Sequence, residues 1–86
     1  MKPGAQHQAG SAQGEGRAAY VKGLSISDAL AQSYYANHAP MIAGAYHVAQ
    51  GFADAARDAG ASVQVCAGYV MAGHNYRCAP SGEQSQ

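Results

Sequence analysis

The chain has 86 residues and a formal net charge of zero, with 48% hydrophobic but only 8% aromatic residues. Its charged residues are scattered, which excludes the clustered positive field that nucleic acid or an anionic membrane requires. The apolar fraction is largely alanine, so one copy removes little surface from water at ~25 cal/mol per Å². Near neutrality also favours self-association. We therefore expect one small unit that functions as an assembly.

The chain opens with a stretch rich in Gly, Ala, Gln and Ser that has few large apolar side chains. This composition predicts a disordered N-terminal arm over residues 1–23. A helical assembly domain is expected to follow over residues 24–77. It opens at Ser25, which can cap a helix, and Asp28, whose carboxylate favours the positive end of the helix. This short helix is expected to run to about Asn37, and its apolar side comprises Ile26, Leu30 and Tyr34.

The sequence Asn37-His38-Ala39-Pro40 marks a turn, because the residue before a proline is biased away from the helical region. Pro40 suits the first turn of a helix, and we predict a long Ala-rich helix from there. Gly60 is a natural left-handed stop, and the helix either breaks near it or continues beyond it. One side of this helix is a stripe that another helix must cover, and another is a strip of alanines that a partner backbone could approach closely. The stripe comprises Met41, Ala45, Val48, Phe52, Ala55 and Ala59, and the strip comprises Ala45, Ala49, Ala53 and Ala56.

Two interpretations of the segment after Gly60 compete. The alternation over residues 62–65 suggests a short strand, whereas the stripe of three- and four-residue spacings continues through the segment and suggests a helix. The residues that continue the stripe include Cys66, Tyr69 and Tyr76. We favour helix over residues 61–76, since a lone strand would have no partner in so short a chain. Residues 78–86 are polar and predict a disordered tail, so the expected fold class is all-α.

Histidines and cysteines invite a metal hypothesis, because His74 and Cys78 could share a helix face with Cys66 two to three turns away. No Cys-x-x-Cys or His-Glu-x-x-His pattern accompanies them, and structural zinc sites normally show such spacing. We therefore predict no metal and no cofactor. A disulfide between Cys66 and Cys78 requires the chain to fold back, crosslinking between molecules is at least as plausible, and we favour two reduced, packed thiols.

The sequence carries no local motif for nucleophilic catalysis, such as Gly-x-Ser-x-Gly, and no persuasive acid–base pair of carboxylates. We therefore expect that the protein is not an enzyme. The six tyrosines are large, stiff and amphipathic, and they suit seams between helices of different subunits.

Three stretches follow one another in an order found in a known family. They are Ile26-Ser27-Asp28-Ala29-Leu30-Ala31-Gln32-Ser33, then Ala39-Pro40-Met41-Ile42-Ala43-Gly44-Ala45-Tyr46, then an Ala-rich run that ends near Gln64. This order resembles the Reb-type "killing trait" proteins that build bacterial refractile bodies, or R-bodies. The likeness spans roughly residues 25 to 76.

The resemblance implies a small, all-helical cytoplasmic protein that polymerises, alone or with related helical subunits, into an insoluble coiled ribbon. In the family that ribbon can extend on acidification and rupture membranes of a host cell. The resemblance therefore implies a toxin-associated structural protein that contacts membranes only indirectly, through the polymer. Because histidine gains its charge in the acidification range, His38 and His47 are the candidate pH-sensing residues.

We expect the assembly interface to follow the apolar stripes. It comprises Ile26, Leu30, Tyr34, Met41, Ala45, Val48, Phe52, Ala55, Ala59, Cys66, Tyr69 and Tyr76. The alternative function is a small helical hairpin that pairs with an unlike protein chain through the same stripe. No run approaches the ~20 apolar residues of a membrane-spanning helix, and the N-terminus lacks the apolar core of a signal peptide, so the expected location is cytoplasmic.

Overall fold

The computed structural model describes residues 4–38 and 43–78, with side chains described for residues 10–38 and 43–76. All regular structure in these ranges is helical, which confirms the predicted all-α class, and the segment after Gly60 is a helix rather than a strand. The helices are α1 (Gly4–Lys22), α2 (Ile26–Ala31), α3 (Tyr34–Asn37), α4 (Gly44–Asp58) and α5 (Val63–Cys78). The tail predicted over residues 78–86 lies outside the described residues, except for Cys78, which ends α5.

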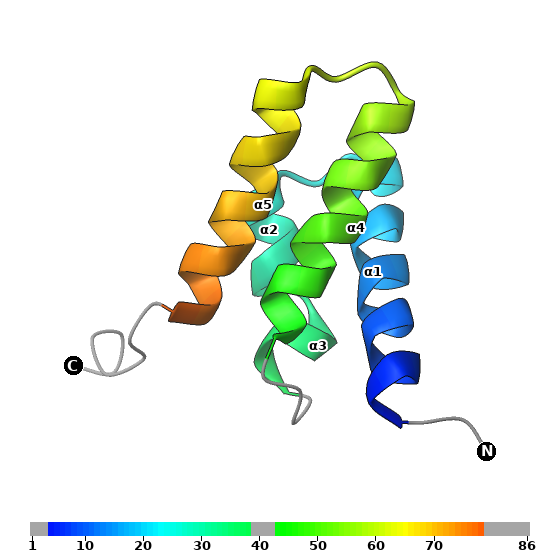
Figure 1. Cartoon of the computed structure of the whole chain (residues 1–86), viewed down its shortest axis with the longest axis vertical. Helices are drawn as coiled ribbons and strands as arrows, with labels where there is room; N and C mark the ends of the chain where they lie inside the picture. Colours follow the sequence, from blue (N-terminus) through cyan, green and yellow to red (C-terminus); the bar gives the residue numbers. More distant parts are fainter. Residues whose placement is uncertain (1–3, 39–42, 79–86) are drawn as a thin grey trace.

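Helix α4 lies at the centre of the bundle (Figure 1). Helices α1 and α5 pack along its two sides, with α1 parallel to α4 and α5 antiparallel to it, while α2 and α3 lie behind α4 in this view. No described helix crosses the front of α4, which faces the viewer. The bundle therefore has one open face, bordered by α1 and α5.

Helix α1 is 19 residues long, where composition predicted a disordered arm over residues 1–23. Glycine and alanine bury little area, but they let two backbones touch and gain many dispersion contacts along the seam. A β-carbon at Gly16 would lie 1.9 Å from the Val48 carbonyl oxygen, and one at Gly51 would lie 1.9 Å from the Gln13 carbonyl oxygen. The structure corrects the prediction for this helix, because the small residues that suggested disorder form the contact with α4.

The stripe predicted along α4 is buried inside the same chain. Phe52 is 1% exposed and packs edge-to-face between two rings, with centroid distances of 5.2 Å to Tyr20 on α1 and 4.9 Å to Tyr69 on α5. Of the other stripe residues, Ala45, Val48 and Ala55 are buried, Ala59 is exposed, and Met41 lies outside the described residues. The cover that the stripe requires comes from the chain's own helices rather than from a second copy.

The chain reverses between α4 and α5 at Gly60, whose φ of 102° favours glycine. Of the two alternatives at Gly60, a break or a continuing helix, the structure shows the break. Ser62 then caps α5, because its Oγ accepts the Val65 N–H at 3.1 Å. Further along α5, a β-carbon at Gly73 would lie 2.3 Å from the Ala49 Cβ. The alanine strip of α4 is thus met by a close backbone, as predicted, and that backbone is α5.

The short helix predicted up to Asn37 is two helices. Ser25 caps α2 as predicted, with its Oγ accepting the Asp28 N–H at 3.0 Å, but α2 ends at Ala31. Ser33 then caps α3, because its Oγ accepts the Ala36 N–H at 2.9 Å. The corner predicted at Pro40 lies outside the described residues, and α4 begins at Gly44.

Glu15 on α1 fixes the break between α2 and α3. Its carboxylate accepts the Tyr34 N–H at 2.9 Å and the Tyr35 N–H at 3.4 Å. It also accepts the hydroxyl of Ser33, which is 2% exposed. Because hydrogen bonds to an ionised acceptor are stronger than neutral ones, this one carboxylate ties α1 to the start of α3.

Candidate interaction surface

The open face of the bundle is hollowed along α5. Two adjoining hollows of about 330 and 510 Å³ share the residues Ala67 and Val70. Together they form a trough over the front of α4, which we name the α4–α5 groove. Its lining residues are Gln13, Tyr46, Gln50, Ala53, Asp54, Arg57, Val63, Cys66, Ala67, Val70, Met71 and His74.

The α5 wall of the groove is apolar and exposed. Val63 is 79% exposed and Met71 is 55% exposed, and Ala67 between them is exposed as well. Residues 59–76 contain no Asp, Glu, Lys or Arg. A helix with apolar residues around much of its circumference is normally covered on more than one side, whereas here α4 covers one side of α5 and the groove side remains open.

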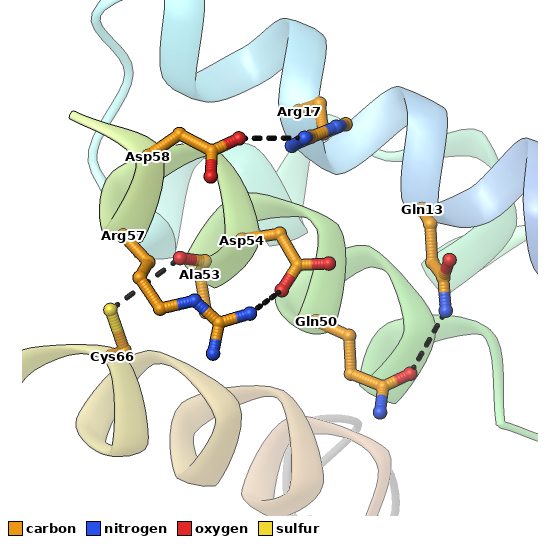
Figure 2. A network of polar contacts seen from close by, with 8 residues as sticks. All are labelled: Gln13, Arg17, Gln50, Ala53, Asp54, Arg57, Asp58 and Cys66. Carbon is orange, nitrogen blue, oxygen red and sulfur yellow. Dashed lines mark hydrogen bonds and ion pairs between the residues drawn. The ribbon is translucent and has the colours of Figure 1, made fainter. Parts of the chain in front are cut away.

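The α4 wall is polar but carries little net charge (Figure 2). Arg57 donates to Asp54 at 3.0 Å, and this pair neutralises itself on the helix surface. Gln50 Oε1 accepts from Gln13 Nε2 at 3.2 Å and lies 3.0 Å from His47 Nδ1. The polar groups of this wall therefore bond to one another. An apolar helix that covered the groove would leave few of them without a hydrogen-bond partner.

The floor of the groove contains Cys66, which is half-buried. Its thiol donates to the Ala53 carbonyl oxygen on α4 at 3.5 Å, so the sulfur points toward α4 (Figure 2). Cys66 and Cys78 both lie on α5, 12 residues and therefore about 18 Å apart along the helix axis. This separation excludes a disulfide between them within one chain.

The predicted interface residues divide between the interior and the surface of the fold. Buried in the core are Leu30, Ala45, Val48, Phe52 and Ala55; half-buried are Ile26, Cys66 and Tyr69; exposed are Tyr34, Ala59 and Tyr76; and Met41 lies outside the described residues. The core residues face inward because α1, α2 and α5 cover them. Of the predicted interface residues that the structure describes, Cys66 alone lines the groove.

The sequence pattern did not single out the groove residues of α5, of which Val63 and Ala67 are exposed and Val70 is half-buried. These residues lie in the segment that fits either a helix or a strand, and the predicted stripe runs along the other side of α5, to Tyr69. The signal that could have found them is the absence of charge over residues 59–76. A helical stretch without charges has no side that is marked for solvent. Either of its apolar sides can therefore be a contact surface.

The two candidate pH-sensing histidines have different surroundings. His38 is exposed at the end of α3, with its ring centroid 5.8 Å from that of Tyr34. His47 is half-buried on α4 and contacts Gln50 Oε1 through Nδ1. The histidine that lines the groove is His74.

Among the side chains that the structure describes, no three His, Cys, Asp or Glu residues are grouped as a metal ion would require. Across the same part of the chain, no helix combines the length and the hydropathy needed to span a membrane. The fold and the groove define a small helical bundle with an open face that is apolar along α5 and polar along α4. In comparisons with protein-family models, characterised proteins and solved structures, no match to this chain was found.

Proposed function

We propose that the protein is a self-associating structural subunit that assembles through the α4–α5 groove. The observation that supports this most directly is the exposed, charge-free α5 wall with Val63 and Met71 at its surface. Fully burying a Val or Met side chain is worth about 1.5–3 kcal/mol, so covering this wall offers a driving force that the isolated chain leaves unused. The zero net charge removes the repulsion that keeps many small proteins apart.

The specific assembly that we propose is a homo- or hetero-polymer of the R-body type, which follows from the sequence resemblance. A ribbon needs more than one contact surface per subunit, because a single two-fold contact closes at the dimer. Four further large apolar side chains are exposed outside the groove lining: Val21 on α1 at 80%, Tyr34 on α3 at 55%, and Val65 and Tyr76 on α5 at 44% and 36%. These residues are the natural candidates for the second surface.

Sedimentation velocity of the purified chain, followed by negative-stain microscopy, tests the proposal. The expected result is a sedimentation coefficient that rises with protein concentration, with ribbons or other ordered polymers in the images. A single monomer species at every concentration would contradict self-association and would favour the alternative, a binding module for an unlike chain. Discrete dimers without polymers would support the groove and contradict the R-body assembly.

A further inference from the structure

We infer that the α4–α5 groove binds α5 of a second copy of this chain, antiparallel and related by a two-fold axis. This inference rests on the proposed self-association and names the surface and geometry through which it occurs. The groove residues that α5 supplies are Val63, Cys66, Ala67, Val70, Met71 and His74. Successive residues of this set are three, one, three, one and three positions apart along α5. This series of spacings is the same from either end of the helix.

The symmetry of that order makes the stripe complementary to itself. A two-fold axis that crosses α5 between residues 68 and 69 exchanges 67 with 70, 66 with 71, and 63 with 74. Each exchange places a smaller side chain opposite a larger one: Ala67 opposite Val70 of the second copy, Cys66 opposite its Met71, and Val63 opposite its His74. Alternation of small and large side chains across a seam is what close helix packing requires.

Charge also favours a second copy as the occupant. A surface that pairs with itself cannot carry a net charge of one sign along its contact, because equal charges would face each other. The α5 stripe carries no Asp, Glu, Lys or Arg. The charges on the opposite wall, Asp54 and Arg57, form a pair within one chain at 3.0 Å. Antiparallel α5 helices would in addition place opposite ends of their dipoles side by side.

The area of the groove is sufficient for a weak but specific dimer. The 16 residues of α5 span about 24 Å. A groove across two helices whose axes are about 10 Å apart is about 20 Å wide, so each chain would bury on the order of 500 Å². The total, on the order of 1,000 Å², reaches the lower limit of specific interfaces. We therefore expect a dissociation constant in the micromolar range or weaker, and a dimer whose central part is an antiparallel four-helix bundle.

Charge-reversal variants test this pairing. In one variant, Ala67→Glu and Met71→Glu place two negative charges on the stripe, and in a second, Ala67→Lys and Met71→Lys place two positive charges there. Both side chains are exposed in the single chain, so the fold should persist, which circular dichroism and thermal melting verify. The matched control is Ala18→Glu with Ala31→Glu, which adds the same negative charge to exposed positions of α1 and α2 that neither proposed surface includes.

Each stripe variant alone should dimerise at least about tenfold more weakly than the wild-type chain, because position 67 of one copy lies one residue along the seam from position 71 of the other, so that like charges adjoin. An equimolar mixture of the two should form a heterodimer at least as stable as the wild-type dimer, and the control should dimerise normally. If the wild-type chain associates and the stripe variants associate equally well, the inferred pairing is wrong while self-association stands. If the wild-type chain does not associate at all, the proposed function itself fails.

Discussion

Gly16 on α1 lies directly against the backbone of Val48 on α4, at a separation where a β-carbon would come within 1.9 Å of the Val48 carbonyl oxygen. Because the clash is with backbone, a side-chain rotation cannot relieve it, and the two helices must move apart. We expect Gly16→Ala to destabilise the fold by about 2–3 kcal/mol, which corresponds to a fall in Tm of about 10 °C or more for a chain of this size. Thermal unfolding followed by circular dichroism measures the change.

The control for that substitution is Gly14, on the same helix, where an added β-carbon meets nothing within 4 Å. Gly14→Ala should raise the stability by about 0.5–1 kcal/mol, since alanine is the better helix former. Equal effects of the two substitutions would show that α1 is not packed on α4 as described.

The fold could be predicted from sequence where large apolar residues repeat, and not where small ones do. Phe52 and Val48 mark α4 clearly, and Gly60 marks its end. The partner of α4 on one side is α1, which makes its contacts through Ala12, Gly16 and Ala19. These small residues bury so little apolar area that they do not form a clear apolar pattern in the sequence. Their spacing of four and then three residues indicates one side of a helix, whereas the composition of the segment suggests disorder.

Glu15 provides a second stability test. Its carboxylate accepts hydrogen bonds from the Ser33 hydroxyl and from the Tyr34 and Tyr35 N–H groups. Glu15→Ala leaves the buried Ser33 hydroxyl and the first turn of α3 without this acceptor, and we expect a loss of about 2 kcal/mol. Glu15→Gln keeps one acceptor oxygen and should lose less. Urea denaturation measures both.

The matched control is Asp58, which pairs with Arg17 on α1 at 2.9 Å, with the two side chains 69% and 46% exposed. Exposed ion pairs contribute about 0–1 kcal/mol, so Asp58→Ala should have a small effect. A larger loss from Asp58→Ala than from Glu15→Ala would contradict the assignment of Glu15 as the residue that holds α3 against α1.

Phe52 is the single phenylalanine of the chain and joins α1 to α5 through Tyr20 and Tyr69. Phe52→Leu retains an apolar side chain but removes both edge-to-face ring contacts, each worth about 0.5–1.5 kcal/mol. We expect a loss of about 2 kcal/mol in chemical denaturation. Tyr34→Leu, at an exposed ring on α3, should change stability by less than half of that amount. Comparable losses would argue against a core centred on Phe52.

The sequence predicts the candidate site less well than it predicts the fold. Which side of α5 faces α4 is decided by Gly73, which allows the close approach to Ala49. That choice leaves Val63, Ala67 and Val70 on the open side. The apolar pattern alone does not distinguish these two sides, because α5 has no charged residue before Arg77 to mark the solvent face.

Self-association of the wild-type chain can be measured by sedimentation equilibrium at protein concentrations from about 10 µM to about 1 mM, a range that spans weak association. We expect an average mass that begins near the 8.8 kDa of one chain and rises toward twice that value if dimers form, or beyond it if polymers form. A mass that stays at 8.8 kDa across the whole range, with the helical spectrum intact, would contradict self-association.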